Sequence, residues 1–338
     1  MLALLTRNAV DAPSLSRSGL GRRAKIVATT AAAFEQVLSI VKPAVAFVVV
    51  HYAGLGPAFM LACRRQGILS VDLQRSPHGS MVHAYRWPAL PAHGYATLPA
   101  VFWSWTKEDA ARVDDWAGKL AEPWHSAIHG GHTQLAHYFD DRHPMTQTWD
   151  ARFASIGDGE KFEREILVAL QPIHGHRAVW DALRSQIEAS PRSWRWWIRR
   201  HPASRPDQDE ESAGLLDLRQ PNVLITEAST LPLPVLLRHM SAVLSLASGA
   251  AVEASMFGVP AFFLIDAARH SFADLIGRGA AAIIDVASVN SAVAKIHATP
   301  IRAMQDHPPA IDETLLQLEE RARVYRLACL PSRKRNVS

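Results

Sequence analysis

Two clusters of polar residues in the second half of the chain have side chains suited to binding an anion. Arg199, Arg200 and His201 end a run of apolar residues, and Ser248 and Gly249 follow another such run. Guanidinium, imidazole and hydroxyl groups donate to phosphate oxygens, as do the backbone N–H groups at the start of a helix. Ligands of open α/β sheets bind where parallel strands end. The clusters therefore predict a diphosphate pocket, provided that both strands belong to one sheet.

His201 is the first candidate for a catalytic contact with such a phosphate. Pro202 restricts its backbone to an extended conformation, and its imidazole can donate a hydrogen bond whether neutral or protonated. Successive side chains alternate across a strand, so only one of Arg199 and Arg200 is expected to face the ligand. The alternative is that His201 and Pro202 only end a strand and begin a loop.

Ser248 and Gly249 lie at the start of a helix predicted over residues 249–257. Serine at this position is an ordinary helix cap. Beside His201 it would instead form a phosphate site, because Gly249 lets the backbone approach the ligand closely. Glu253, one turn further along, would bind a ribose or sugar hydroxyl; the alternative is that it lies on a solvated helix face or in a local ion pair.

A second set of candidates follows the apolar segment 69–73 in the first half of the chain. His78 follows a predicted strand, and an imidazole has a pKa suited to general-base catalysis near neutrality. Gln74 would contact a second substrate or hold that loop, and Gly79 completes the set. The chain has 16 histidines, many of them in predicted loops, so an ordinary loop histidine is the alternative for His78.

Strands and helices alternate along the chain, which predicts an α/β protein with two doubly wound parallel sheets. Continuous apolar runs such as 45–50 are typical of strands buried on both faces. In the first half we predict strands over 25–29, 44–51, 69–73 and 101–105, and helices over 32–41, 56–66 and 107–119. In the second half we predict strands over 166–170, 195–199, 223–226, 242–245, 261–264 and 281–285, and helices over 178–189, 233–239, 249–257, 272–278 and 311–327.

The length of 338 residues is sufficient for two domains. We place an N-terminal domain at 1–145 and a C-terminal domain at 146–338. We expect the first 22 residues to form a loose arm or the remnant of a strand–helix unit. We expect residues 122–153 to form a crossover between the two domains.

Composition narrows the class of protein. The net charge of +4, with no dense basic run, suits an anionic small molecule or membrane surface and disfavours nucleic acid. The two cysteines predict neither a disulfide nor a metal centre. The first apolar run is too short for a signal peptide, and the stretch 43–63 is too interrupted for a bilayer span. We expect a cytoplasmic protein, with the inner face of the cytoplasmic membrane as an alternative location.

The tryptophans Trp194, Trp196 and Trp197 alternate with Arg195 in a pattern that also occurs on nucleic-acid stacking surfaces. A strand packed between helices explains the same pattern more simply, because such a strand carries large apolar side chains on both faces.

Four segments of the second half, in order along the chain, carry a family resemblance. They are 166–172, an opening strand; 197–202, an Arg/Lys-x-His-Pro signature; 226–233, which contains Glu227; and 248–260, a Ser…Glu-Ala…Gly-x-Pro element. Together they resemble the donor domain of GT-B-type bacterial surface-polysaccharide glycosyltransferases, including capsule, sialyl- and polysialyltransferases. The resemblance covers residues 165–290.

The first half resembles this family less closely. Residues 67–74 are similar to a strand that normally ends in Gln-His-Gly, and the distantly related teichoic acid polymerases have a longer version. Here Gln74 and His78-Gly79 are separated by three residues. The N-terminal domain also lacks the usual first strands, so we expect it to be shortened.

The resemblance implies two Rossmann-like domains facing a cleft, with the acceptor on the N-terminal side and the nucleotide-sugar donor on the C-terminal side. It implies metal-independent transfer of a sugar, without a cofactor, to a glycan or lipid-linked acceptor in capsule or surface-polysaccharide biosynthesis. A CMP-linked donor is one option. His78 and His201 would be catalytic, and Arg199, Arg200, Ser248, Gly249, Glu253 and Glu227 would hold the donor.

Two alternatives of other classes stay open. The interrupted Gln-His-Gly element favours a catalytically degenerate scaffold in a polysaccharide assembly complex. A nucleotide-sugar epimerase or hydrolase would share the donor pocket but would need carboxylates acting on the sugar itself.

Overall fold

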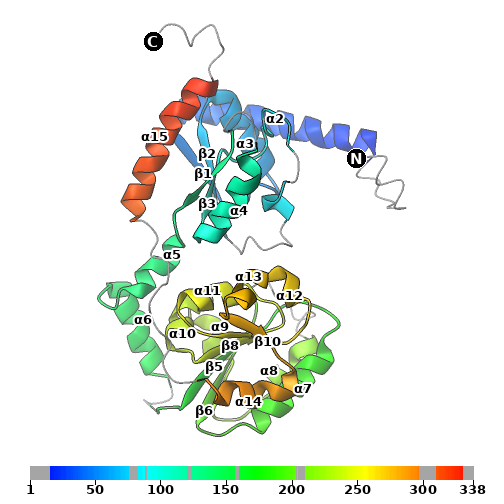
Figure 1. Cartoon of the computed structure of the whole chain (residues 1–338), viewed down its shortest axis with the longest axis vertical. Coiled ribbons are helices and arrows are strands. Elements are labelled where there is room, and N and C mark those ends of the chain that lie inside the picture. Colours follow the sequence, from blue (N-terminus) through cyan, green and yellow to red (C-terminus); the bar gives the residue numbers. More distant parts are fainter. Residues whose placement is uncertain are drawn as a thin grey trace. The chain divides into compact units, whose positions relative to one another are not determined.

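The computed structural model describes residues 16–75, 83–87, 90–119, 124–156, 160–202, 204, 210–296 and 310–329. Contacts divide these residues into two compact units. Unit 1 contains 16–75, the described part of 83–132, and 310–329, whereas unit 2 contains the described part of 133–296. Each unit is built on a parallel sheet with helices against it (Figure 1), which confirms the predicted α/β class.

The sheet of unit 1 has the order β1-β2-β3-β4, with all neighbouring strands parallel. Its strands are β1 (Val45–Val48), β2 (Leu69–Leu73), β3 (Val101–Ser104) and β4 (Ser126–His129). Its helices are α2 (Arg17–Val41), α3 (Gly56–Gln66), η2 (His83–Tyr85), α4 (Lys107–Ala117) and α15 (Ile311–Cys329). The predicted bounds of α3 and β2 are those observed.

The predicted strand over 25–29 is wrong, because these residues belong to α2. Ile26, Val27 and Thr29 are β-branched and look strand-like over five residues. The partly or fully buried side chains of α2, however, recur at Val27, Ala31, Phe34 and Leu38, which is helical spacing. The helix begins after Ser16, whose hydroxyl accepts a hydrogen bond from the Gly19 N–H at 3.0 Å. The described part of the expected loose arm is thus the first turn of this helix.

The segment 122–153, predicted as an interdomain crossover, contains the passage from unit 1 to unit 2 between His132 and Thr133, but its described residues form elements of both units. Residues Ser126–His129 form β4, which pairs with β3 at the edge of the unit 1 sheet. The segment then forms α5 (Thr133–Ala136), η3 (His137–Phe139) and α6 (Pro144–Ala154) of unit 2. A four-residue strand that contains a serine and a histidine has too few apolar residues to be recognised in the sequence.

Helix α15 packs on the sheet of unit 1, although the sequence groups it with the C-terminal domain. Leu318, Ala322 and Tyr325 are buried against β2, β3 and β4. The Arg64 guanidinium of α3 lies 3.3 Å from the ring centre of Trp124 and 6.0 Å from that of Tyr325. The apolar stripe of α15 therefore packs on a face of the unit 1 sheet, far along the chain from the strands that it covers.

The sheet of unit 2 has the order β10-β9-β8-β5-β6-β7, again with every pair parallel. Its strands are β5 (Arg164–Ala169), β6 (Trp194–Arg199), β7 (Val223–Leu224), β8 (Ala242–Ser245), β9 (Ala261–Phe263) and β10 (Ala281–Ile283). The chain runs outward from β5 to β7, then returns past β5 to β8 and continues to β10. The order therefore reverses between β5 and β8, as in a doubly wound Rossmann-like sheet.

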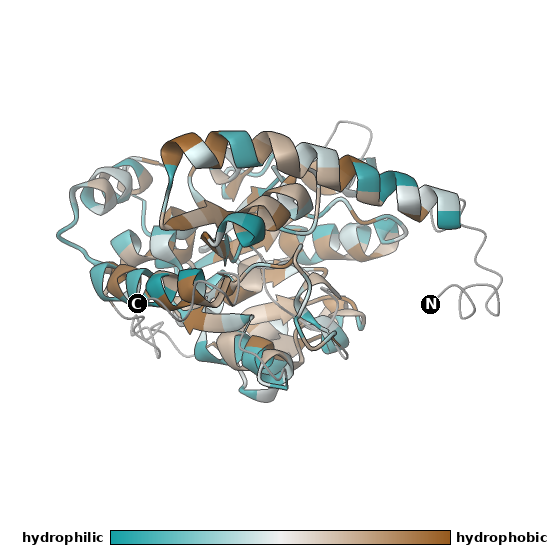
Figure 2. Cartoon of the chain, turned by 90° about the horizontal axis from the view of Figure 1, so that it is seen from above, coloured by the Kyte–Doolittle hydropathy of each residue, from teal (hydrophilic) through white to brown (hydrophobic). Residues whose placement is uncertain are grey.

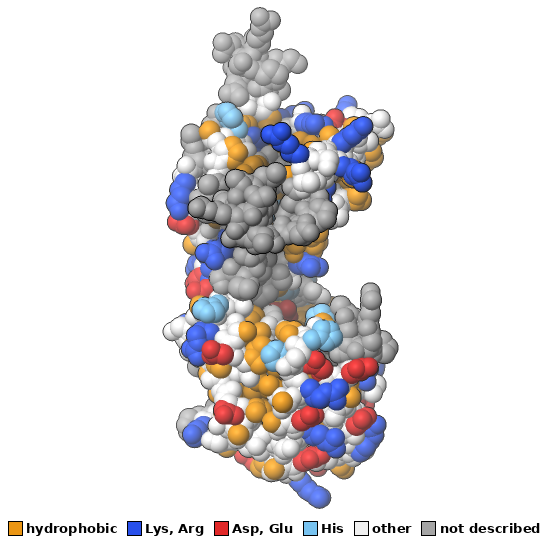
Figure 3. Space-filling model, turned by 90° about the vertical axis from the view of Figure 1, so that its right-hand side faces the viewer, with side chains coloured by type: hydrophobic (Ala, Val, Ile, Leu, Met, Phe, Trp, Pro, Cys, Tyr) orange, Lys and Arg blue, Asp and Glu red, His pale blue; other side chains and the backbone are white. Residues whose placement is uncertain are grey.

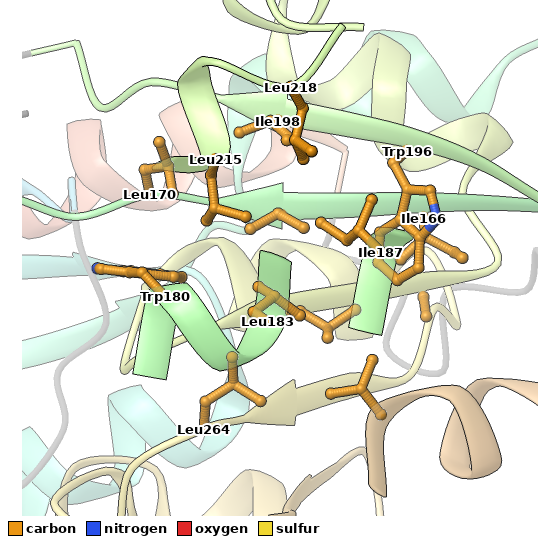
Figure 4. Close-up of a cluster of buried hydrophobic side chains, with 14 of the residues drawn as sticks. Ile166, Leu170, Trp180, Leu183, Ile187, Trp196, Ile198, Leu215, Leu218 and Leu264 are labelled. Atoms are coloured by element: carbon orange, nitrogen blue, oxygen red, sulfur yellow. The ribbon is translucent and has the colours of Figure 1, made fainter. Parts of the chain in front are cut away.

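The core of unit 2 lies between its sheet and the long helix α7 (Arg177–Glu188). Figure 4 shows Leu183 and Ile187 of α7 facing Ile166 and Trp196 of the central strands. Further helices are η5 (Glu210–Ser212), α8 (Ala213–Leu216), α9 (Thr226–Thr230), α10 (Leu233–His239), α11 (Ala250–Met256), α12 (Ala268–Ser271), α13 (Ala273–Gly277), η6 (Val286–Ser288) and α14 (Val289–Ala294).

The tryptophans of β6 are core residues. Trp196 and Trp197 are both 0% exposed, and they point to opposite faces of the sheet. Neither ring is available to stack on a nucleobase. On the face of unit 2 seen in Figure 3, acidic side chains are interspersed with lysine and arginine.

A buried ion pair joins the two strands β5 and β6. The Arg195 guanidinium donates to both carboxylate oxygens of Glu165, at 2.6 and 2.9 Å, and the Trp197 Nε1–H donates to the same carboxylate at 2.7 Å. The guanidinium also lies 4.6 Å from the ring centre of Phe162. Loss of one partner would leave the other charge buried without compensation.

We therefore expect Arg195→Met to lower the free energy of unfolding of unit 2 by about 3 kcal/mol. The matched control is Arg184→Met on α7, which removes an exposed pair with Glu188 and should cost less than about 1 kcal/mol. Chemical denaturation of both variants measures the difference. Equal losses would show that the buried pair contributes no more than a surface one.

Candidate functional site

The carboxyl ends of the three central strands of unit 2 bring together the two polar clusters found in the sequence. Arg199 at the end of β6 and Ser245 at the end of β8 are both in register with Ala169 of β5. The two clusters thus follow strands on either side of β5, at one edge of one sheet. This edge, where the strand order reverses, is the position at which doubly wound sheets bind ligands.

Gln171 holds the loop that precedes α11. Its Nε2 donates to the Ala247 carbonyl at 2.9 Å, and its Oε1 accepts from the Ala247 N–H at 2.8 Å. This two-way hydrogen bond crosses from the segment after β5 to the segment after β8. Sequence analysis did not identify Gln171 as a site residue, although a polar residue directly after a buried strand was a usable signal.

Ser248 is held from both sides in this loop. Its N–H donates to Ser245 Oγ at 3.1 Å, and its own Oγ accepts from the Ala250 N–H at 3.2 Å. Gly249 is the N-cap of α11, and the Ser248 hydroxyl accepts from the first residue of the helix without being its N-cap. Ser248 and Gly249 are each partly exposed, so this loop is open to a ligand.

Arg199 and Arg200 differ as strand alternation predicts. The Arg199 guanidinium turns inward and its Nη1 donates to the carbonyls of Ala228 and Leu231, both at 2.6 Å. Arg200 is exposed, and its N–H donates to Ser229 Oγ at 3.2 Å. Arg199 therefore fixes α9 beside the end of β6.

Glu253 on α11 interacts electrostatically with Arg199. Burial raises the pKa of the Glu253 carboxyl to about 7, and the Arg199 charge acts in the opposite direction. Burial likewise lowers the pKa of Arg199, and the Glu253 carboxylate offsets part of that effect. Glu253 thus does not lie on a freely solvated helix face. The structure brings these two predicted donor residues together.

His201 and Glu227 lie near the same edge. His201 follows β6 directly and is partly exposed. Glu227 is a partly exposed residue of the short helix α9, whose last turn accepts the Arg199 side chain. Together with Ser248 and Gly249, all the donor-side candidates belong to segments that follow β6, β7 or β8.

The candidates of unit 1 are less completely described. Gln74 is buried, its Nε2 donates to Asp109 Oδ2 at 2.7 Å, and its Oε1 accepts from the Trp105 N–H at 2.6 Å. This side chain holds the segment after β2 against the segment after β3. His78 and Gly79 lie outside the described residues.

Unit 1 also contains a buried polar cluster that sequence analysis missed. His51, after β1, is 1% exposed, and its Nδ1 lies 3.0 Å from Asp72 Oδ2. The Tyr85 hydroxyl donates to the same oxygen at 2.9 Å. Burial and the Asp72 carboxylate raise the pKa of Tyr85. A signal was present, because the aspartate in the apolar strand Leu69–Leu73 requires a buried partner.

Comparison with known proteins gives a match of fold. No family model and no curated protein matches the sequence. The UDP-GlcNAc 2-epimerase from Neisseria meningitidis, bound to UDP-GlcNAc, superposes with a TM-score of 0.58 at 17% identity over 91% of this chain and 84% of that one. The enzyme from Methanocaldococcus jannaschii, in complex with UDP-GlcNAc and UDP, gives 0.54 at 14% identity over 88% and 80%.

The chain has a GT-B-like fold. The two parallel-sheet units confirm the expected Rossmann-like α/β architecture. The reversal of strand order expected of a doubly wound sheet is present in unit 2, whereas the described strands of unit 1 run in the single order β1-β2-β3-β4. The match is to GT-B-type structures in general and does not single out the capsule or sialyltransferase families. At these identities the likeness is one of fold.

The pKa of Glu253 leads to a prediction on stability. The folded pKa of about 7 lies above the ordinary value of 4.5, so folding favours the protonated carboxyl. The free energy of unfolding of unit 2 should therefore fall as the pH rises from 4.5 to 7. Glu253→Gln removes this dependence, and we expect it to stabilise the unliganded protein by about 3 kcal/mol at pH 8 and not at pH 4.5.

Chemical denaturation at the two pH values measures this effect. The control is Glu188→Gln, which changes an exposed glutamate of α7 and should give the same small difference at both pH values. A gain for Glu253→Gln that did not depend on pH would contradict the assigned burial of a charge.

Proposed function

We propose that unit 2 binds a nucleotide sugar at the carboxyl edge of its sheet and that the protein is an enzyme acting on this ligand. The observation that carries the proposal is the pair of hydrogen bonds between Gln171 and Ala247. These bonds connect the segments that follow β5 and β8, the two strands between which the strand order reverses. They hold Ser248 and Gly249 open beside the segment that contains Arg199 and His201. A basic side chain, an imidazole and a loop entering a helix at one edge suit a diphosphate.

The proposed roles follow from the contacts. His201 and Arg200 donate to the diphosphate, because one follows the strand end and the other has an exposed guanidinium. Ser248 and Gly249 bring backbone close to the same group. Arg199 positions α9, and Glu253 accepts or donates a hydrogen bond to a ligand hydroxyl, because its pKa near 7 makes both protonation states accessible. Glu227 is a further donor-side residue on α9.

The reaction that the comparisons favour is epimerisation or hydrolysis of the nucleotide sugar. The structures with the similar fold include UDP-GlcNAc 2-epimerases with UDP-GlcNAc bound. Cleavage of the bond between the sugar and the diphosphate needs stabilisation of the departing phosphate, and cationic or N–H donors of unit 2 would supply it without a metal. A uridine nucleotide is accordingly the first ligand to test, before the CMP-linked alternative.

Glycosyl transfer to a glycan or lipid-linked acceptor, as in surface-polysaccharide synthesis, is the second candidate. An epimerase or hydrolase would need carboxylates directed at the sugar. At the described strand ends of unit 1, the buried carboxylates are already engaged, Asp72 with His51 and Tyr85, and Asp109 with Gln74 and Arg112. This observation favours a transferase that takes its base from a histidine, for which His78 is the proposed residue.

The binding step is tested with His201→Ala. We expect turnover of the nucleotide sugar to fall about a hundredfold, since loss of one phosphate contact in the transition state costs about 3 kcal/mol. The unfolding midpoint should stay unchanged, because His201 follows a strand end and contributes little to the core. His137→Ala, an exposed histidine on η3, is the control. Full activity of the His201 variant would remove the proposed phosphate role.

Incubation with UDP-GlcNAc, with and without a lipid-linked or glycan acceptor, distinguishes epimerisation or hydrolysis from glycosyl transfer. A second sugar epimer, or UDP released without acceptor, supports epimerisation or hydrolysis. UDP released only with acceptor supports transfer. Calorimetric titration with UDP, CMP and GDP precedes this assay, and failure of the folded protein to bind any nucleotide would leave the scaffold interpretation.

A further inference from the structure

Helix α2 has one face in the core of unit 1 and one face exposed along its whole length. Ala31 and Leu38 are 0% and 5% exposed and pack with α3, and the ring of Phe34 lies edge-on to that of Phe59 at 5.2 Å. Among the described residues, α2 is the one helix long and apolar enough to cross a membrane. Figure 2 shows hydrophobic residues distributed along it among hydrophilic ones.

The exposed face carries a stripe of large apolar side chains. Ile26, Val37 and Ile40 are 58%, 56% and 81% exposed. At 100° per residue they lie within a narrow arc opposite Ala31 and Leu38, with the exposed Ala33 between them. Exposed apolar side chains that are aligned on one face of a helix, in contrast to scattered ones, mark a surface that meets another apolar phase.

Basic side chains continue the same face toward the start of the helix. Arg22 and Arg23 are exposed and lie one turn before Ile26. Arg17, Lys25 and Lys42 add positive charge at the two ends of α2. The helix has a single acidic residue, Glu35, which is engaged by the Arg65 guanidinium at 2.8 Å. The exposed face is therefore apolar and cationic.

The charge pattern decides between the possible occupants of this face. A second copy of α2 would place Arg22 and Arg23 against arginines in a parallel pair and against Ile40 in an antiparallel pair. Neither arrangement offers the arginines a carboxylate, and both would desolvate a guanidinium. A surface of anionic lipid matches both parts of the face, because it offers phosphates to the arginines and acyl chains to the apolar residues.

The packing of α2 excludes a spanning orientation for the folded protein. Removal of the helix from unit 1 would expose the core cluster around Ala46, Ala58 and Cys63. It would also break the Arg65–Glu35 pair and the hydrogen bond from Gln66 Nε2 to the Glu35 carbonyl, at 2.6 Å. The helix can therefore lie on a bilayer while it stays in the fold.

We propose that α2 attaches the protein to an anionic phospholipid surface, with Ile26, Val37 and Ile40 at the acyl boundary and Arg22 and Arg23 at the lipid phosphates. The attachment is independent of nucleotide binding, which takes place in unit 2. It assigns a function to the largest exposed apolar side chains of the helix, which the proposed enzyme activity does not use.

The test is flotation of the full chain with vesicles of phosphatidylcholine alone and of phosphatidylcholine with phosphatidylglycerol. We expect binding to the anionic vesicles only, weakened by added salt. Arg22→Glu with Arg23→Glu should reduce the partition coefficient at least tenfold, since each basic residue near such a surface contributes about fivefold. Ile26→Ser with Val37→Ser and Ile40→Ser should reduce it by a similar factor.

Two matched control variants test whether vesicle binding depends on this face of α2 or only on the net charge and the total exposed apolar surface of the protein. Arg142→Glu with Arg152→Glu makes the same change of charge at exposed residues of unit 2. Leu315→Ser with Leu316→Ser and Val324→Ser removes comparable exposed apolar surface from α15. Both should bind vesicles as the unaltered chain does, and circular dichroism confirms that every variant is folded.

Three outcomes would overturn the proposal. The first is failure of the chain to bind anionic vesicles, and the second is binding of the α2 variants that equals that of their controls. Light scattering provides the third: a dimer that the apolar α2 variant converts to a monomer, with vesicle binding unchanged, would show that a second copy covers this face.

Discussion

The arrangement of unit 2 depends on one topological constraint, the reversal of strand order between β5 and β8. Parallel strands place all their carboxyl ends at one edge, and the reversal leaves the segments after the two central strands diverging from each other. Gln171 bridges that divergence through both atoms of its amide. Ala247 leads into the loop with Ser248 and Gly249 and then into α11, which carries Glu253. Arg199, held by the carbonyls of Ala228 and Leu231, interacts electrostatically with that glutamate.

Much of this arrangement could be predicted from the sequence, because strands buried on both faces have distinctive composition. The bounds of α3, β2, α10 and β8 agree with their predicted ranges. Elements were missed where local composition misleads or where the partner is remote. The first half of α2 resembles a strand over five residues, and β4 is too short to be recognised. Helix α15 packs on a sheet whose last strand lies nearly two hundred residues earlier in the sequence.

The candidate site was predictable to a similar extent. Strand alternation and the order of the motifs pointed to Arg199, Ser248 and Glu253, which the structure places at one edge. The sequence marks Gln171 and Asp72 as polar residues beside or within buried strands, but their partners could not be derived, because these depend on which residues meet across the sheet. A sequence shows that Asp72 needs a partner but does not show which residue supplies it.

The position of α15 has a consequence for the order in which the protein is made. Both α2 and α15 belong to unit 1, so the chain leaves that unit after β4, builds unit 2, and then returns. On the ribosome, all of unit 2 emerges while one face of the unit 1 sheet is still uncovered. Val71 and Trp103 of that sheet are buried only when Leu318 and Tyr325 of α15 pack against them. Unit 2 can reach its native state first, and unit 1 completes its core only after the last long helix has been translated.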